Sequence, residues 1–259
     1  MIDAKLPEEL NKFYARFDRP APSRPINSEP DEPPSQLSVE DTRRGLSKLN
    51  VKKAPGRDDI SPRLLRCCTD ELSGVLCDIF NWSLRSSHVP NVLKKSVIIP
   101  VPKRTPITCH NDYRPVALTS IVMKLFEKFV LQHLKSILPS TLDPFQFGYR
   151  KNRSIEDAVA LTLHHVLNFL DLKEPNYVRL LLIDYSSAFN TISPFKLHDK
   201  LMNTMRLNRS LCDWILDFLL HRTKRVKIGN HLSGTLVINT GTPQGCVLSP
   251  LLFSLCTSD

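Results

Sequence analysis

The sequence predicts an α+β fold, and three observations support this class. A run of four bulky aliphatic residues, 180–183, has the composition of a strand buried on both faces and ends at Asp184. Several segments carry apolar residues at helical spacing, and residues 122–137 form the strongest of them. Two short apolar runs flank Gly229-Asn230-His231, a pattern typical of a β-hairpin. The chain of 259 residues is long enough to bury a sizeable core.

The N-terminal part is predicted to contain two helices separated by a linker. Apolar residues recur at helical spacing within residues 1–19, which favours a short helix. The run 19–34 is dense in proline, which is typical of an extended linker or a surface arm, and we place the start of the globular region near Gln36. Ser38 has the sequence context of a helix cap, and its helix is expected to end near Asn50.

The next part of the chain is predicted to alternate between helices and strands. A helix is expected to begin at Pro62 and to present one apolar face from Leu65 to Ile79. A short strand is expected over residues 97–103, followed by a return strand over residues 111–118. After the helix over residues 122–137 comes a loop with three cations, and Ser154 is then expected to cap a helix with an apolar series through Leu170.

The C-terminal part is predicted to hold two helices, the hairpin and a tight turn. Helices are expected to open at Ser193-Pro194 and at Ser210, where hydroxyl side chains precede apolar series. The hairpin follows, with strands near residues 226–229 and 235–238. Residues 240–245 form a polar turn with two glycines, and it leads into an apolar run.

Composition and charge narrow the functional classes. The formal net charge is +9 and the pI is about 9.3, which favours an anionic partner, either nucleic acid or a membrane surface. The seven cysteines have no C-x-x-C spacing, so we expect reduced thiols in an intracellular protein. No apolar run approaches about 18 residues, and the N-terminus has no apolar signal-peptide core, so a membrane-spanning helix and a secretory signal are not expected.

Several polar residues have two interpretations each when they are taken singly. Asp184 at the end of an aliphatic strand suits a cap of the following turn, or a ligand for Mg²⁺ beside a substrate phosphate. Lys103 and Arg114 suit solvated strand ends as well as phosphate contacts. The loop with Arg150 and Arg153 suits a solvated charge run, although its interleaved aromatic residues favour nucleic-acid contact.

The order of the motifs along the chain is far more specific than any one of them. A basic turn is followed by Ile-Pro-x-Pro-Lys, Tyr-Arg-Pro-Val-Ala-Leu and Gln-x-Gly-Tyr-Arg-x-x-Arg-Ser. Ile-Asp-x-Ser-x-Ala-Phe and Thr-Pro-Gln-Gly-x-x-Leu-Ser-Pro come next. From about residue 37 to the C-terminus this series resembles the reverse transcriptase of LINE-type (non-LTR) retrotransposons.

The resemblance implies roles in catalysis and nucleotide binding. Asp184 resembles the first catalytic metal ligand of the palm, and the backbone at Tyr185 would face the same metal. Phe189 resembles the aromatic gate that crowds the sugar 2′ position and so favours deoxynucleotides. Lys103 and Arg114 are similar to the fingers residues that hold the incoming triphosphate. Fixed cations and Mg²⁺ suit this reaction because they offset charge in an in-line displacement.

The resemblance also implies contacts with the template. Gln244 and Gly245 resemble the turn that lines the nucleotide pocket and the template. Gln146, Arg150 and Arg153 match a fingers motif that is associated with the template strand. The implied partners are therefore an RNA template, a DNA primer and deoxynucleoside triphosphates, with Mg²⁺ as cofactor and no membrane partner.

Two departures from the family pattern bear on activity. Asn190 stands where these elements usually carry Asp, and we expect a mild effect because the amide has a similar shape. The paired-aspartate motif, usually aromatic-Ala-Asp-Asp, does not occur in the 259 residues, and Asp259 lies ahead of its expected place. We therefore expect a fragment that is inactive as a polymerase on its own.

Together these features predict a partial right-hand polymerase. Residues 1–36 form an N-terminal segment and proline-rich linker, residues 37–176 form helical fingers, and residues 177–259 form part of the palm, with the thumb absent. The expected function is that of an RNA-directed DNA polymerase domain of a non-LTR retrotransposon. The alternative is a non-catalytic remnant that binds nucleic acid through its basic fingers surface.

Overall fold

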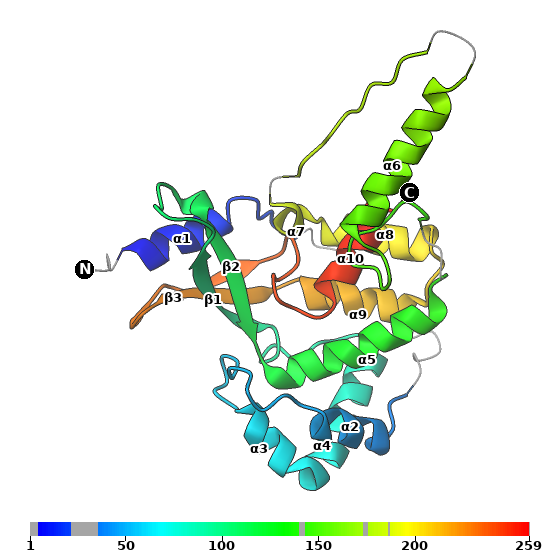
Figure 1. Cartoon of the computed structure of the whole chain (residues 1–259). Coiled ribbons are helices and arrows are strands. Elements are labelled where there is room, and N and C mark those ends of the chain that lie inside the picture. The colour runs from blue at the N-terminus through cyan, green and yellow to red at the C-terminus, as the bar shows by residue number, and fades with distance from the viewer. Residues whose placement is uncertain (1–4, 22–35, 140–142, 173–175, 186, 259) are drawn as a thin grey trace.

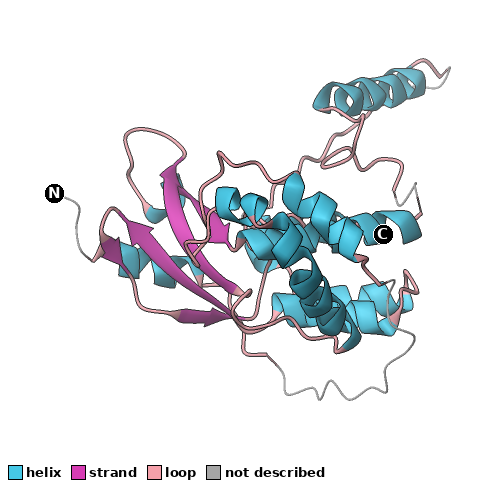
Figure 2. Cartoon of the chain, turned by 90° about the horizontal axis from the view of Figure 1, so that it is seen from below, coloured by secondary structure: helices cyan, strands magenta, loops and turns pink. Residues whose placement is uncertain are grey.

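The computed structural model describes residues 5–21, 36–139, 143–172, 176–185 and 187–258. These residues form a mixed α+β fold, which confirms the predicted class. A small sheet occupies one end of the molecule and most helices gather at the other, as two perpendicular views show (Figure 1, Figure 2). The proline-dense run falls largely outside the described residues, since residues 22–35 are not among them.

Several predicted helices start where the sequence places a capping hydroxyl. Ser38 and Ser154 each accept a hydrogen bond from the backbone N–H three residues ahead, in capping boxes with Asp41 and Asp157. The predicted single helix from Pro62 is wrong in one respect, because it breaks into two at a non-helical residue, Cys68. In chain order, the α-helices are α1 (Leu6–Tyr14), α2 (Val39–Ser47), α3 (Pro62–Cys67), α4 (Thr69–Arg85), α5 (Ile121–Ile137), α6 (Ile155–Leu170), α7 (Ala188–Thr191), α8 (Pro194–Asn203), α9 (Arg209–Leu219) and α10 (Ser249–Thr257).

The sheet confirms the first predicted strand pair and corrects the register of the second. Residues 227–228 pair with residues 231–232 across the tight turn, whereas residues 236–238 pair with residues 222–224. The first strand pairs antiparallel with its return strand and parallel with the third, while the third pairs antiparallel with the last two. The order along the sheet is β2-β1-β3-β4, with β5 also pairing with β3. A single 3₁₀ turn, η1 (His110–Asp112), separates the first two strands. The strands are β1 (Lys95–Pro102), β2 (Tyr113–Thr119), β3 (Arg222–Ile228), β4 (His231–Leu232) and β5 (Leu236–Ile238).

Two clusters of apolar side chains hold these elements together. The larger lies among the helices and is centred on aromatic rings, where Phe80 stacks on Phe126 at 4.3 Å between centroids and Trp214 meets Phe126 at 5.0 Å. The smaller lies between α1 and the sheet and contains Leu10 and Val226, both fully buried. The segment that precedes the proline-dense run therefore packs on the sheet and contributes to its core.

The predicted buried strand at residues 180–183 is wrong. These residues are extended, but they pair with no strand in the described part of the chain and their side chains are 63–91% exposed. A strand is stable only when neighbouring strands accept its backbone hydrogen bonds and another layer covers its faces. Aliphatic composition therefore does not suffice to predict a buried strand, because pairing and burial depend on partners that the local sequence does not specify.

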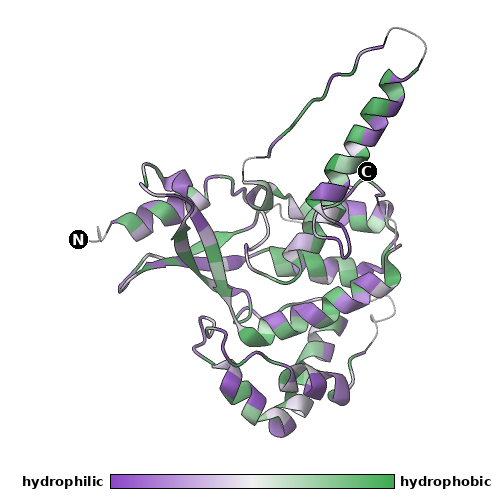
Figure 3. Ribbon diagram, viewed as in Figure 1, coloured by the Kyte–Doolittle hydropathy of each residue, from purple (hydrophilic) through white to green (hydrophobic). Residues whose placement is uncertain are grey.

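Helix α6 also forms as the local sequence predicts, but it lacks the burial that its apolar residues suggest. It forms where the capping box predicts, yet none of its residues is buried, and Val159, Leu163 and Leu167 are each more than half exposed. The helix projects away from the other elements, and apolar positions recur along much of its length (Figure 1, Figure 3). Among the described residues, no helix combines the length and apolarity that crossing a membrane requires.

Candidate active site

A cavity of about 410 Å³ lies where the β1–β2 hairpin, the segment before α7 and the turn over residues 240–245 meet. We call this turn the glycine turn and the cavity the Asp184 cavity. Six of the predicted catalytic and nucleotide-binding residues, which come from four separate motifs, line this cavity together. Those six are Lys103, Arg114, Asp184, Tyr185, Phe189 and Gln244.

The β1–β2 hairpin brings the two predicted phosphate-binding cations to one wall of the cavity. The backbone N–H of Lys103 donates to the carbonyl of Asp112 at 2.7 Å, and Arg114 lies opposite Val101 in the strand register. The carboxylate of Asp112 accepts hydrogen bonds from the backbone N–H and hydroxyl of Thr108, at 2.9 and 2.8 Å, and these bonds hold its pKa well below the usual range. Asp112 thus organises the hairpin that presents both cations.

Asp184 and Phe189 both line the cavity. Asp184 ends the exposed extended segment, and Phe189 lies in the first turn of α7. The Phe189 ring is held from two sides, by Tyr149 at 5.9 Å and by Phe253 at 5.0 Å between centroids. The backbone around Asp184 has less support, because residues 180–183 pack against no neighbouring strand in the described structure.

The glycine turn is fastened to both α7 and β2. The backbone N–H of Thr242 donates to the carbonyl of Phe189 at 2.7 Å, and the N–H of Ala117 donates to the carbonyl of Gln244 at 2.9 Å. Gly241 has φ +73°, and a Cβ at this position would lie 2.7 Å from the Phe189 carbonyl oxygen. Gly245 also has a positive φ, of +104°, and follows the cavity residue Gln244 in the turn. Glycine at residue 241 therefore allows the turn to approach α7 closely enough to place Gln244 in the cavity.

A buried arginine that the sequence analysis did not single out holds the same turn from behind. The guanidinium of Arg222, on β3, donates to the carbonyls of Leu219, Thr240 and Gly241 at 2.6–2.8 Å. Burial lowers the pKa of this guanidinium to about 10. Its sequence context, a basic strand of ordinary appearance, carries no motif that distinguishes it from an exposed cation.

A second cation missed by the sequence analysis enters the cavity from the N-terminal segment. Arg16 lines the cavity, donates to the Ser187 hydroxyl at 3.1 Å and lies over the Phe13 ring at 3.7 Å. It becomes part of the site because α1 packs on the sheet, although the proline-dense run separates it from the other motifs in sequence. The available sequence signal was one arginine among three aromatic residues over residues 13–17.

The residues after the turn are held by a buried carboxylate on α5. One oxygen of Glu127 accepts hydrogen bonds from the backbone N–H groups of Val247 and Leu248, at 2.6 and 3.0 Å, just ahead of α10. Glu127 is fully buried, and burial raises the pKa of its carboxyl group to about 7 despite these two donors. The helical spacing of apolar residues in α5 indicates that residue 127 lies near the core. An acidic residue at such a position stands out from its apolar neighbours in the sequence.

Glu127→Gln is expected to remove a pH dependence of stability. Because folding raises the carboxyl pKa from 4.5 to about 7, the folded chain binds the proton more tightly between these values, and stability falls as pH rises through this window. The penalty above pH 7 is on the order of 3 kcal/mol, and the neutral amide avoids it while still accepting the two hydrogen bonds. We expect urea unfolding to give Glu127→Gln a larger free energy of unfolding than the wild type at pH 8, but not at pH 5. Glu71→Gln, at an exposed position on α4, is the control, and equal pH profiles for wild type and Glu127→Gln would contradict the assignment.

The predicted template-binding residues lie in the loop beside the cavity and do not line it. Gln146 donates from its amide to the carbonyl of Gly148 at 3.1 Å, and Arg150 donates to the carbonyl of Asp143. The Arg153 guanidinium lies 5.3 Å from the centre of the Phe147 ring. The loop contacts the cavity residue Phe189 through the ring of Tyr149.

The donor set of the cavity bears on metal binding. In the described residues that line it, Asp184 supplies the one carboxylate, and no group of three or more His, Cys, Asp or Glu side chains in the described part of the chain is arranged to hold a metal. A single carboxylate suits Mg²⁺ that is also bound by substrate phosphates and water, because Mg²⁺ keeps several waters and takes few protein ligands. Asn190 also lines the cavity and offers an amide in place of a second carboxylate.

Comparison with known proteins places this site in a family. Residues 101–259 match the family of the reverse transcriptase (RNA-dependent DNA polymerase). The chain is 30% identical to the RNA-directed DNA polymerase from mobile element jockey of Drosophila melanogaster over 88% of its length. It is 29% identical to the probable RNA-directed DNA polymerase from transposon BS of the same species, also over 88%. A transposon TX1 protein of Xenopus laevis is 23% identical over 85% of the chain.

The matches cover most of this chain but only part of each relative. The chain spans about a quarter of the length of the two Drosophila relatives. The matches therefore show the family of the chain but do not assign it the activity of the whole relatives. The matched region contains the Asp184 cavity and the glycine turn, apart from the contribution of α1. The chain belongs to the reverse transcriptase family and is a reverse transcriptase domain of the non-LTR retrotransposon type.

Proposed function

We propose that the Asp184 cavity binds the incoming deoxynucleoside triphosphate for RNA-directed DNA synthesis. The observation that carries this proposal is the convergence of six residues from four separate motifs on one cavity of about 410 Å³. A cavity of that size is in the range of small-molecule sites. Its lining combines cations, a carboxylate and an aromatic ring, which match the phosphates, the metal and the sugar of a nucleotide respectively.

The triphosphate is assigned to the wall formed by the cations. Lys103 and Arg114 on the hairpin, with Arg16 from the segment after α1, line one cavity and offset the negative charge of a polyphosphate. Arg114 presents a planar set of donors, whereas Lys103 offers a compact charge on a flexible stem. These side chains orient the phosphates and hold charge that develops on their oxygens during transfer.

Lys103→Ala is expected to weaken binding of dTTP roughly tenfold to hundredfold, because it removes a charge-assisted hydrogen bond. Lys48→Ala, at an exposed position just after α2 and outside the cavity, is the control and should leave affinity unchanged. Equilibrium dialysis with labelled dTTP and Mg²⁺ measures both variants against the wild type. Equal dTTP affinities for Lys103→Ala and the wild type would remove Lys103 from this role.

Asp184 is the residue that would hold Mg²⁺, together with phosphate oxygens and the backbone near Tyr185. The ion, when bound, supplies charge neutralisation and alignment of the reacting oxygens. The amide of Asn190 lies in the same lining and offers a neutral oxygen, which supports a single firmly held ion better than two.

The aromatic wall is assigned to sugar selection. Phe189 lines the cavity and is braced by Tyr149 and Phe253, so its ring has little freedom to move away from a 2′-hydroxyl. Gln244, held through its carbonyl by β2, is assigned to the base or template side of the same pocket. Gly245 is assigned to the turn that keeps the backbone close to β2.

The surrounding elements are assigned to the parts of a right-hand polymerase. We assign residues 37–176 to helical fingers and residues 177–259 to part of the palm, with residues 1–36 as an N-terminal segment. The mixed α+β fold and the position of the cavity between the hairpin and α7 support this arrangement. The packing of α1 on the sheet indicates that the N-terminal segment also contributes to the nucleotide pocket.

Template and primer are assigned to the basic surface that includes the loop over residues 143–153. The net charge of +9 and the cations Arg150 and Arg153 favour a phosphate backbone, and the interleaved aromatic rings favour stacked bases. A non-catalytic remnant would keep this binding surface, and the single carboxylate among the described lining residues is the observation that favours this alternative.

Binding of an RNA–DNA duplex to the 259-residue chain is expected to depend steeply on salt. Phosphate contacts release counterions, so the logarithm of affinity should fall linearly with the logarithm of salt concentration, with a slope of about 0.7–0.9 for each phosphate neutralised. Filter binding over a range of NaCl concentrations measures this slope. Affinity that does not change with salt would contradict a charge-driven interface.

A further inference from the structure

A carboxylate of the N-terminal segment holds the start of the glycine turn. The Asp18 carboxylate accepts a hydrogen bond from the backbone N–H of Asn239 at 2.7 Å, at the residue that leads from β5 into the turn. The next residue, Arg19, donates its backbone N–H to the hydroxyl of Thr240 at 3.0 Å. Residues 18 and 19 therefore fix the entry of the turn, although 221 sequence positions separate each residue from its partner.

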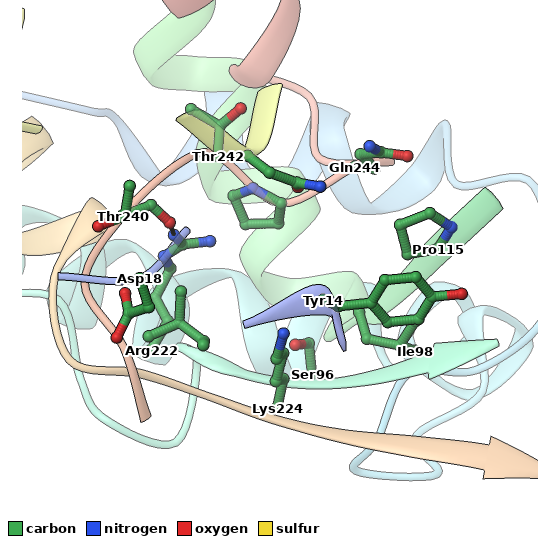
Figure 4. Close-up of a pocket in the computed structure, with 13 residues that line it drawn as sticks. Tyr14, Asp18, Ser96, Ile98, Pro115, Arg222, Lys224, Thr240, Thr242 and Gln244 are labelled. Atoms are coloured by element: carbon green, nitrogen blue, oxygen red, sulfur yellow. Dashed lines mark hydrogen bonds between the residues drawn. The ribbon is translucent and has the colours of Figure 1, made fainter. Parts of the chain in front are cut away.

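Asp18 also supplies negative charge to two buried cations behind the turn. Arg222 and Lys224 lie on one face of β3, and with Asp18 they line a small cavity of about 60 Å³. Burial lowers the pKa of the Arg222 guanidinium to about 10 and that of the Lys224 amine to about 7, and the charge of Asp18 opposes both shifts. Figure 4 shows Asp18 with Arg222 and Thr240 on one side of this cavity and Gln244 on the other. Asp18 therefore stabilises the cation that holds the carbonyl of Thr240.

The same segment also reaches the loop that follows Asp184. The Arg16 guanidinium donates to the hydroxyl of Ser187 at 3.1 Å and lines the Asp184 cavity. Ser187 immediately precedes α7, the helix that carries the cavity residue Phe189. Residues 16–19 thus contact both backbone segments that shape the cavity, the one after Asp184 and the glycine turn.

We propose that Asp18 is a positioning residue for the nucleotide site, and that it holds the glycine turn in the conformation that places Gln244 in the Asp184 cavity. This inference rests on the proposed function of that cavity. Asn239 and Thr240 begin the turn, so a shift of their backbone displaces Gln244 a few residues further on. A misplacement of about 1 Å in a site can cost as much as a hundredfold in activity. The family match begins at residue 101, so this contribution comes from outside the matched region.

The N-terminal segment offers a matched control at Glu8. Its carboxylate accepts a hydrogen bond from the backbone N–H of Gly234 at 2.9 Å, in the connection between β4 and β5. Glu8 and Asp18 therefore make the same kind of bond from one segment, but Gly234 lies outside both the glycine turn and the lining of the Asp184 cavity. A change at Glu8 tests the attachment of the segment, whereas a change at Asp18 tests the placement of the turn.

The first measurement is amide hydrogen exchange in the 259-residue chain, followed by NMR. An amide that loses its acceptor exchanges faster, because the surrounding backbone opens more readily to water. We expect Asp18→Ala to speed exchange of the Asn239 amide at least about tenfold and to leave the Gly234 amide unchanged, and Glu8→Ala to do the reverse. Asp18→Asn keeps an oxygen acceptor and should keep exchange at Asn239 slow. An unchanged exchange rate at Asn239 in Asp18→Ala overturns the proposal.

The second measurement is the affinity for dTTP in the presence of Mg²⁺, by equilibrium dialysis. Asp18→Ala should weaken binding about tenfold, Glu8→Ala should leave it unchanged, and Asp18→Asn should restore it to within about threefold of the wild type. Equal affinities for Asp18→Ala and the wild type overturn the proposal. An equal loss in Glu8→Ala also overturns it, because a general loosening of the segment then explains the loss. A wild type that binds no dTTP contradicts the proposed function instead, and the exchange rates alone then decide whether Asp18 holds the turn.

Discussion

A polypeptide of these 259 residues is expected to show no template-dependent primer extension, even if it binds nucleic acid and nucleotide as we propose. Two Mg²⁺ ions about 3.5–4 Å apart require more oxygen ligands than one carboxylate supplies. Among the described residues that line the cavity, Asp184 is the one acid, and Asn190 contributes only a neutral amide. The primer hydroxyl therefore lacks a firmly held activating group.

The measurement is primer extension with a poly-A template, an oligo-dT primer, Mg²⁺ and dTTP. It should be run beside a longer polypeptide that carries an aromatic-Ala-Asp-Asp hairpin and a thumb, the parts that the family resemblance implies. We expect extension from the longer polypeptide and its loss on Asp184→Ala. Asp171→Ala, at an exposed acid after α6, is the matched control and should retain activity.

The outcomes separate the two functional assignments. Extension by the 259-residue chain, abolished by Asp184→Ala, would show that one carboxylate suffices and that the expectation of inactivity is wrong. No extension by either polypeptide, with nucleic-acid binding intact, would favour the non-catalytic remnant.

Phe189→Ala is expected to produce the second large effect, a loss of discrimination against ribonucleotides. The ring forms part of the cavity wall and is braced by Tyr149 and Phe253, so a 2′-hydroxyl placed against it would meet a rigid surface. Removing a steric clash of this size changes a selectivity ratio by about 1–3 kcal/mol, or roughly 10- to 200-fold.

The measurement is the ratio of kcat/KM for dTTP to that for UTP in the longer, active polypeptide. Phe189→Tyr keeps the bulk of the ring and should keep the ratio, which separates a steric effect from a general disturbance of the pocket. An unchanged ratio in Phe189→Ala, with polymerisation intact, would remove Phe189 from sugar selection.

The sequence by itself determined the family and most local structure. The motif order predicted a non-LTR reverse transcriptase domain, and the family match confirms it. Caps and turns were predictable because their cause is local: the Ser38 and Ser154 hydroxyls bond backbone three residues away, and short polar segments connect paired strands.

Long-range packing decided what the sequence could not. The aliphatic run at residues 180–183 predicted burial, yet it lies exposed because burial requires partner strands, and local composition does not specify them. Arg16 joined the cavity only because α1 packs on the sheet across the proline-dense run. A one-dimensional pattern cannot show such a contact between distant segments.

The buried charges show the same limit most clearly. Arg222 and Lys224 look alike in sequence and sit two residues apart on one face of β3, where the alternation of a strand places both beneath the glycine turn. Arg222 donates to three backbone carbonyls there, whereas the Lys224 ammonium group lies 5.8 Å from the centre of the Tyr14 ring and faces the charge of Asp18. Local sequence sets which face a side chain takes, but the partners it meets on that face are set by the tertiary fold, because they come from segments far away in the chain.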